Sequence, residues 1–167
     1  MAAECDTVIE GAIEGGQSAL LHATALAIGH RGVIIRGSPG AGKSDLALRA
    51  LTAASSSLVP WAVRLVADDQ VQVARTGGAI MMSCPAAIAA KLEVRGIGIV
   101  DLPAAAVATG STRLVLVVDL TNARDWVERM PARACVDVLG LRLACLKLYP
   151  FEGSAALKLV LAVMAVP

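Results

Sequence analysis

The chain has 167 residues and a mass of 17.0 kDa, a size typical of one domain with its own hydrophobic core, so we predict that residues 1–167 form a single domain. Fifteen basic against fourteen acidic residues give a formal net charge of +1 without a basic run, and aromatic residues make up 2% of the chain, which argues against a nucleic-acid partner. Hydrophobic residues make up 56%, but charged residues interrupt every long apolar stretch, so we expect no membrane insertion.

The N-terminal segment and the cysteines indicate where the protein works. The segment is acidic where a secretory signal would be basic, and it has no apolar run before a small-residue cleavage site, so we expect a cytoplasmic protein. The four cysteines, Cys5, Cys84, Cys135 and Cys145, form no C-x-x-C pair, and only two histidines are available to complete a metal site. We interpret the cysteines as reduced, partly buried thiols.

Two strands joined by a hairpin are predicted near the start of the chain. The apolar segment 20–28 ends at the turn Gly29-His30-Arg31-Gly32, and the β-branched run Val33-Ile34-Ile35 follows. From Lys43 onward the pattern is helical, with one apolar face made by Leu46, Ala47, Ala50 and Leu51. This order of strand, glycine-rich loop and helix, with a mainly aliphatic composition, favours an α/β fold.

Further strands are predicted in the middle of the chain. Residues 63–73 alternate in polarity and are interrupted by Asp68 and Asp69, and the Gly77-Gly78 turn leads into a strand at 79–82. This pattern indicates additional strand pairing on both sides of the two aspartates.

The second half contains a predicted helix, a strand and an apolar end. Pro85 can start a short helix that runs to Lys91, and the glycines at 96 and 98 exclude a helix just beyond it. Residues 114–120 form a clear buried strand. The apolar segment 155–166 is either an interface or a final buried helix, and we favour burial.

The segment GSPGAGKS fits the phosphate-loop pattern G-x-x-x-x-G-K-[ST] in full and stands between a β-branched strand and a helix, as that pattern requires. Glycines allow positive φ and close approach, so backbone N–H groups can point at phosphate oxygens, while the lysine can reach the β- and γ-phosphates. A glycine turn that merely joins strand to helix is the alternative. The predicted nucleotide-binding residues are Gly37, Ser38, Pro39, Gly40, Ala41, Gly42, Lys43 and Ser44.

Asp68 and Asp69 follow a predicted strand, at the position where open α/β sheets bind their ligands. Adjacent strand residues face opposite ways, so one carboxylate could face the γ-phosphate as a base or Mg²⁺ partner while the other is turned toward the scaffold. The sequence does not choose between them, and an ordinary acidic turn is the alternative.

The segment LEVRGIGIVD places Glu93 and Arg95 among apolar residues and two glycines. Charges in such surroundings are costly unless they are paired or bind a ligand. Taken alone, this segment could contain a structural ion pair only.

In combination, LLHATALAIGHRG, GSPGAGKS, VADD and LEVRGIGIVD closely resemble the catalytic domain of the bacterial HPr kinase/phosphorylase family, in the family's order and over residues 18–120. The resemblance implies a P-loop kinase domain with a phosphoenolpyruvate carboxykinase-like fold, a mixed sheet flanked by helices. It also implies an enzyme that uses ATP and Mg²⁺ to phosphorylate a serine of an HPr-like phosphocarrier protein of a phosphotransferase system. Fewer than twenty residues precede the matching region, so the chain resembles a short form without the family's N-terminal domain.

The same resemblance implies catalytic roles. By position, Asp69 matches the family's general base and His22 its active-site histidine, while Lys43 matches a phosphate-binding residue. Asp68 and Arg95 fall beside them and are expected to position metal or phosphate.

For the metal, the resemblance implies that Ser44 contacts Mg²⁺ and that Glu93 supplies a second contact. Without the resemblance, His22 would be interpreted as a partly buried structural histidine.

Phosphorylase activity and assembly are less well defined by the sequence. The family's phosphorolysis loop contains an arginine, for which Arg142, Arg133 and Arg129 are poor candidates, so we predict a kinase first. The family forms hexamers, which makes a homo-oligomer a hypothesis. A nucleotide-sensing module without efficient catalysis and a small-molecule P-loop kinase are alternative functions.

Overall fold

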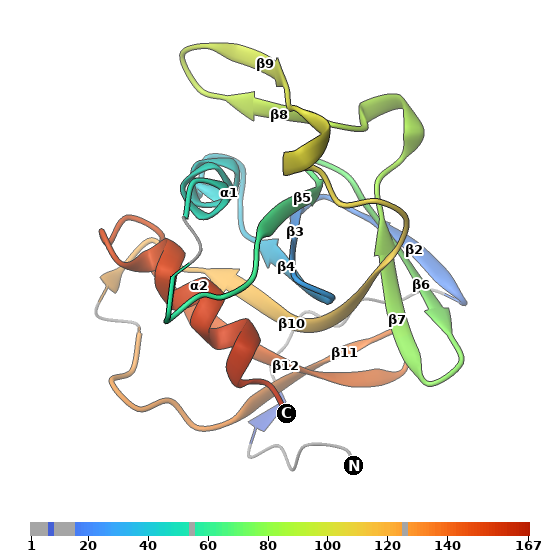
Figure 1. Ribbon diagram of the computed structural model, residues 1–167. Coiled ribbons are helices and arrows are strands. Elements are labelled where there is room, and N and C mark those ends of the chain that lie inside the picture. Colours follow the sequence, from blue (N-terminus) through green and yellow to red (C-terminus); the bar gives the residue numbers. More distant parts are fainter. Residues whose placement is uncertain (1–6, 9–15, 54–55, 125–126) are drawn as a thin grey trace.

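The structure is a computed structural model that describes residues 7–8, 16–53, 56–124 and 127–167 (Figure 1). It contains a ten-stranded mixed sheet, a separate two-stranded hairpin and two helices. The large sheet consists of β1 (Thr7–Val8), β2 (Ser18–Leu21), β3 (Thr24–Ile28), β4 (Arg31–Arg36), β5 (Val63–Ala67), β6 (Val71–Thr76), β7 (Ala79–Ser83), β10 (Thr112–Leu120), β11 (Ala134–Val138) and β12 (Leu141–Leu148). The hairpin consists of β8 (Lys91–Val94) and β9 (Gly98–Asp101), and the helices are α1 (Lys43–Leu51) and α2 (Ala155–Ala165).

The direction of the central strands brings four strand ends to one edge of the sheet. β10 pairs in parallel with both β4 and β12. β3 is antiparallel to both β4 and β5, so β5 runs in the same direction as β4. The segments that follow β4, β5, β10 and β12 therefore emerge at the same edge, which is where ligands bind in α/β sheets.

The core lies on both faces of this sheet because β3 and β4 are almost entirely apolar and buried. Alternate side chains enter two separate clusters: Leu26 and Ile35 contribute to one, Ala25 and Ile34 to the other. Buried residues of α1 and α2 belong to the first cluster only. Both helices thus cover the same face, and strands of the curled sheet close the other.

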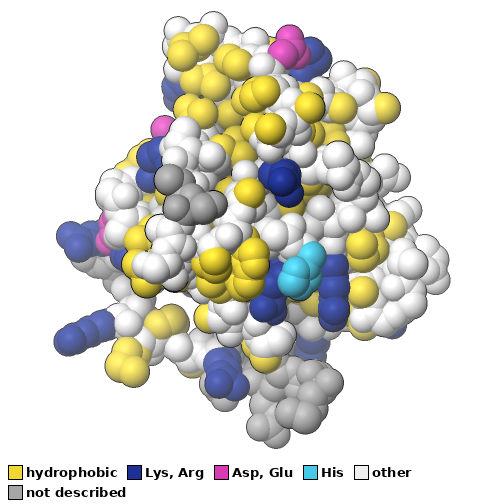
Figure 2. Space-filling view, in the orientation of Figure 1, with side chains coloured by type: hydrophobic (Ala, Val, Ile, Leu, Met, Phe, Trp, Pro, Cys, Tyr) yellow, Lys and Arg dark blue, Asp and Glu magenta, His cyan; other side chains and the backbone are white. Residues whose placement is uncertain are grey.

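The β8–β9 hairpin projects from the large sheet (Figure 1), and hydrophobic side chains gather over it (Figure 2). Ile97 and Ile99 are 78% and 70% exposed, whereas Leu92 is fully buried in the helix-covered cluster. Leu92 therefore anchors the hairpin to the body of the protein. This anchor fixes the residues on either side of it in β8.

Most of the predicted elements are confirmed. The β3–β4 hairpin, the helix from Lys43, the strands around the two aspartates and the buried strand ending at Leu120 all form. The apolar end forms α2, whose inner residues are buried, as we favoured. No helix among the described residues is long and apolar enough to cross a membrane.

Two predictions are wrong. The helix expected from Pro85 to Lys91 is only a 3-10 turn at Ala86–Ile88, because Ala90 takes a positive φ of 60° and the following residues pair as β8. The cysteines are not all reduced thiols: Cys84 and Cys145 are free, but Cys135 is disulfide-bonded. The four cysteines are scattered along the sequence without a recognisable spacing pattern, so nothing in the sequence indicated this bond. Cys5 lies outside the described residues.

Candidate active site

The phosphate loop connects β4 to α1 and has the backbone that its glycines predict. Gly40 and Gly42 have φ of 81° and 94°, in the left-handed region that favours glycine. A β-carbon on Gly42 would lie 3.2 Å from the ring of Phe151, so a larger residue does not fit there. Lys43 is nearly buried, and its Nζ donates to the carbonyl oxygen of Gly37 at 2.9 Å. The ammonium group is thus held within the loop, at the N-terminal end of α1.

Asp68 is the buried member of the aspartate pair, with 5% of its surface exposed. Its Oδ1 accepts hydrogen bonds from the hydroxyls of Thr24 at 2.7 Å and Ser44 at 3.0 Å. Its Oδ2 accepts from the backbone N–H of Glu93 at 3.1 Å. Asp68 therefore links β3, the start of α1 and β8, and its carboxylate is fixed beside the hydroxyl that the motif assigns to metal.

Asp69 is the exposed member, with 62% of its side chain accessible. Its φ of 70° places it in the left-handed region, so the chain turns sharply between β5 and β6. Asp69 Oδ1 lies 3.0 Å from Nδ1 of His22, whose side chain is 55% exposed. The structure thus gives the two aspartates different surroundings, which the sequence left open.

These groups border a single cavity of about 510 Å³. The predicted site residues that line it are His22, Pro39, Gly40, Gly42, Lys43, Ser44, Asp68, Asp69, Glu93 and Arg95. The guanidinium of Arg95 lies near the loop, since a β-carbon on Gly40 would be 3.9 Å from its Nη2. Four sequence segments far apart along the chain therefore meet at one site.

The remaining predicted residues lie at the other side of the loop. Ser38 and Ala41 border a second cavity of about 470 Å³, and the Gly37 carbonyl accepts the hydrogen bond from Lys43. Every predicted nucleotide-binding residue therefore lies at one of the two cavities or contacts the loop lysine.

The donor groups fit a triphosphate with Mg²⁺. The loop supplies a lysine ammonium and glycine-rich backbone for phosphate, and Ser44 with Asp68 and Glu93 supplies the oxygen ligands that Mg²⁺ prefers. Among the described residues, no group of three or more His, Cys, Asp or Glu side chains could hold a metal by itself. This agrees with Mg²⁺ sites in which one or two carboxylates act together with substrate phosphates.

Among the residues at this site that sequence reasoning missed are Thr24 and Phe151. Thr24 is fully buried and donates to Asp68, but a lone threonine in an apolar strand gave no signal. Phe151 borders both cavities and is 58% exposed, more than 100 residues along the chain from the loop it touches. The one feature of the sequence that could have drawn attention to it is that aromatic residues are rare and Phe151 is the single phenylalanine of the chain.

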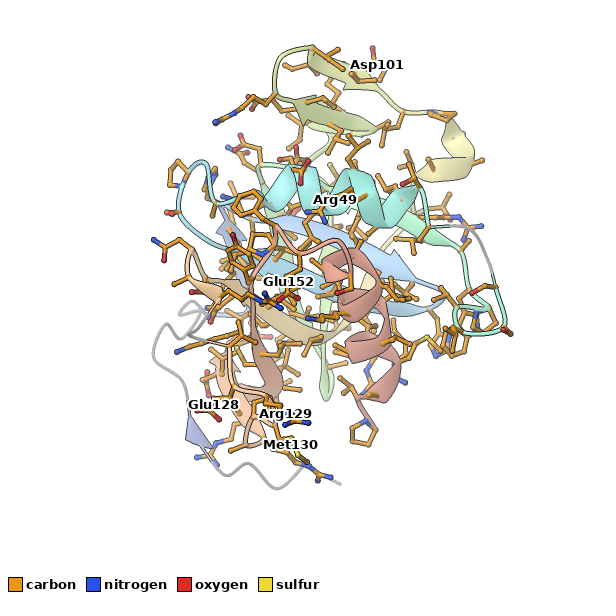
Figure 3. The ribbon with its side chains drawn as sticks, turned by 90° about the vertical axis from the view of Figure 1, so that its left-hand side faces the viewer. Arg49, Asp101, Glu128, Arg129, Met130 and Glu152 are labelled. Carbon is orange, nitrogen blue, oxygen red and sulfur yellow. The ribbon has the colours of Figure 1, made fainter. Side chains whose placement is uncertain are left out.

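The arginines considered for phosphorolysis lie elsewhere. Neither Arg129, Arg133 nor Arg142 lines either cavity. Arg142 is paired in register with Asp137 across the β11–β12 hairpin. Arg129 lies toward the end of the molecule opposite Asp101 of the β8–β9 hairpin (Figure 3).

Comparison with known proteins gives concordant results. The model of the HPr Serine kinase C-terminal domain matches residues 16–165. The HPr kinase/phosphorylase of Bordetella pertussis (strain Tohama I) is 39% identical over 117 residues, which cover 66% of this chain and 35% of that protein. The HPr kinase/phosphorylase of Cupriavidus metallidurans is 35% identical over 139 residues, covering 80% of this chain and 41% of that protein.

A solved structure supports the fold. The Hpr(Ser) kinase/phosphatase from Coxiella burnetii superimposes with a TM-score of 0.70 at 23% sequence identity, covering 86% of this chain and 88% of that one. The mixed α/β architecture predicted from the motifs is therefore confirmed. The chain spans only about a third of the length of the Bordetella relative.

Proposed function

The chain belongs to the HPr serine kinase C-terminal domain family, and from this premise we propose that it is an ATP- and Mg²⁺-dependent protein kinase that phosphorylates a serine of an HPr-like phosphocarrier protein. The observation that carries this proposal is the cavity in which the phosphate loop faces two carboxylates with different partners. A pure nucleotide sensor would not need an exposed carboxylate paired with a histidine beside that loop.

The phosphate loop binds the triphosphate of ATP. Backbone N–H groups around the positive-φ glycines and the ammonium of Lys43 counter the phosphate charge. Lys43 exchanges its hydrogen bonds to loop carbonyls for phosphate oxygens when the nucleotide binds. Arg95, which lies near Gly40, adds a second positive charge at the same place.

Ser44, Asp68 and Glu93 would hold Mg²⁺ beside the phosphate loop. The ion, when bound, would neutralise charge on the transferred phosphoryl group. Asp68 positions the Ser44 hydroxyl through their hydrogen bond, while the N–H of Glu93 in turn orients Asp68. The three residues act as one unit.

Asp69 accepts the proton of the incoming serine hydroxyl. Its carboxylate is exposed and therefore accessible to a protein substrate, whereas Asp68 is nearly buried and already accepts three hydrogen bonds. His22 orients Asp69 through the contact at 3.0 Å. The serine oxygen then attacks the γ-phosphorus, and ADP leaves on the opposite side.

The direction we propose is phosphorylation. Among the described residues, the arginines considered for phosphorolysis do not line the cavity, which supports phosphorylation over the reverse reaction. Assembly into a homo-oligomer, residence in the cytoplasm and the organisation of residues 1–167 as one domain stay predictions.

Mass spectrometry of an HPr-like carrier after incubation with the protein, ATP and Mg²⁺ tests the proposal. We expect one phosphoserine, lost with Lys43→Ala and with Asp69→Asn. Asparagine tolerates the positive φ at 69, so this variant keeps the backbone and should still bind ATP. Asp101→Asn, which changes an exposed carboxylate on β9, is the matched control. Phosphoserine formation that persists in Asp69→Asn would contradict the role of the base, and a wild-type protein without Mg²⁺-dependent ATP affinity would contradict the function.

A further inference from the structure

A second cavity borders the phosphate loop and is not lined by Asp68, Asp69 or Glu93. It is bordered by Ser38 of the loop, by Leu120 at the end of β10 and Asn122 after it, by Lys147 of β12 and by Phe151. Because β4, β10 and β12 are parallel, these residues emerge at the same sheet edge as the loop itself. The cavity of about 470 Å³ is large enough for a nucleoside.

We propose that this second cavity binds the base and ribose of the nucleotide, with Phe151 as the stacking surface for the base. The proposal rests on the proposed kinase function and assigns the donor's nucleoside end to residues outside the sequence motifs. It follows from reaction geometry, ring placement and charge.

Reaction geometry requires the two substrates to lie on opposite sides of the transferred phosphoryl group. In phosphoryl transfer the attacking and leaving oxygens are roughly in line. Asp69 and His22 line only the first cavity, so the acceptor hydroxyl approaches from there. The leaving diphosphate and its nucleoside then extend away from Asp69, and the second cavity, which borders the loop without Asp69 or His22, can receive them.

Phe151 is placed and held for stacking. Its ring is 58% exposed, and its edge would be 3.2 Å from a β-carbon at Gly42. Tyr149 contacts it in an edge-to-face arrangement with ring centroids 5.7 Å apart. An exposed aromatic ring fixed beside phosphate-binding backbone can stack on a base without having to be ordered by the ligand.

The segment that carries Phe151 is clamped to α1. Arg49 of α1 donates to the carbonyl oxygens of Pro150 and Glu152, and Arg49 and Glu152 lie close together in Figure 3. Hydrogen bonds from Lys158 and Arg124 hold the Glu152 carboxylate and lower its pKa. The ring is therefore positioned by three basic residues from three different parts of the chain.

The charges around the second cavity suit a neutral nucleoside next to a phosphate chain. Its one lining acid, Asp119, accepts two hydrogen bonds from Arg36 at 2.7 and 2.8 Å, so its charge is neutralised. Asn122 offers an exposed amide that can donate to and accept from a base edge, and Lys147 adds a cation. The first cavity, by contrast, contains the carboxylates of Asp68, Asp69 and Glu93.

Calorimetric binding of Mg²⁺-ATP and of Mg²⁺-tripolyphosphate, which lacks a nucleoside, tests the proposal. We expect the wild-type protein to bind ATP more tightly than tripolyphosphate. Phe151→Ala should lose roughly tenfold in ATP affinity, the loss expected when one base no longer stacks on one aromatic ring. Its affinity for tripolyphosphate should stay within about twofold of the wild-type value. Asn122→Ala should weaken ATP binding selectively as well. Leu161→Ala, which shortens another exposed apolar side chain on α2, is the control and should change neither.

The outcomes separate this proposal from the kinase function. Wild type that binds the two ligands equally, or Phe151→Ala that weakens both equally, would overturn the nucleoside site while leaving the phosphate loop intact. Wild type that binds neither ligand would overturn the kinase function and this site with it. Photolabelling with 8-azido-ATP gives a second measurement: labelled peptides from 119–122 or 147–151 support the site, and labelling at 93–95 overturns it.

Discussion

Thr24→Val should weaken both the fold and phosphate transfer, although Thr24 contacts neither substrate in the proposed arrangement. Valine has nearly the shape of threonine, so the variant removes one hydroxyl without opening a cavity. Thr24 is fully buried at the start of β3, and its hydroxyl donates to Oδ1 of Asp68 at 2.7 Å. After the change, Asp68 keeps only the donors from Ser44 and Glu93.

The size of the effect follows from the burial of Asp68, which is 5% exposed and cannot replace the lost donor fully with water. A hydrogen bond to a charged group contributes about 1.5–3 kcal/mol. A protein of this size loses about 2–4 °C in Tm for each kcal/mol, so we expect Tm to fall by roughly 3–12 °C. The looser carboxylate should also reduce kcat by roughly tenfold, because Asp68 positions the Ser44 hydroxyl.

Differential scanning calorimetry and a phosphocarrier assay measure the two effects. Thr112→Val is a matched control because Thr112 is also buried but lies at the opposite end of β4 from Thr24. Thr112 lies near Gly32 at the start of β4, whereas Thr24 pairs with Ile35 near the end of β4 that leads to the phosphate loop. We expect the control to keep its kcat. If Thr24→Val retained both wild-type Tm and wild-type kcat, the hydrogen bond to Asp68 would be energetically unimportant and the reasoning would fail.

Two further changes test other parts of the site, and a third tests a buried thiol of β12. His22→Ala removes an exposed pair with Asp69, so Tm should change by less than about 2 °C while transfer falls by roughly tenfold or more in a single-turnover assay. In Gly42→Ala the new side chain would have to adopt a φ of 94° and would contact the ring of Phe151, so calorimetry should show a loss of ATP affinity. Gly78→Ala is the control: Gly78 has open space around it and no positive φ, so this variant should keep the wild-type ATP affinity. Burial and the charge of Asp119 raise the pKa of Cys145 to about 12. Between pH 9 and 12 the thiol therefore stays protonated in the folded protein but ionises in the unfolded chain, so the free energy of unfolding should fall as the pH rises. Denaturant titrations at several pH values should show this fall, and it should be smaller in Cys145→Ala.

The parts of the site that the sequence predicted are those encoded locally. The glycine spacing, the β-branched strand before it and the amphipathic helix after it lie within about twenty residues, so their geometry follows from short-range rules. The helix begins at Lys43 as expected, and Asp68 directly follows β5. The polar side chains that we propose to contact metal or phosphate were all named from the sequence, and these roles stay predictions.

The parts it missed depend on contacts between distant positions. Thr24 and Asp68 are 44 positions apart, and only the pairing of β3 with both β4 and β5 brings them together. Phe151 reaches Gly42 because α1 and α2 pack on the same face of the sheet. The short helix predicted from Pro85 failed for a related reason, since pairing with β9 decided the conformation of Lys91 and its neighbours.

In the proposed mechanism, the adjacency of Asp68 and Asp69 allows a short turn to serve two different chemical tasks. In a regular strand, neighbouring carboxylates would face opposite sides of the sheet, and only one could reach the site. The positive φ at Asp69 turns the chain just after β5, so both line the same cavity but differ in exposure, at 62% for the Asp69 side chain against 5% for Asp68. Asp68 accepts hydrogen bonds from three donors, which suits the proposed role of a fixed metal partner, whereas Asp69 Oδ1 pairs with the imidazole of His22, which leaves Oδ2 for the proposed proton transfer. Exchanging these two environments would bury the proposed base, where the proposed protein substrate could not reach it.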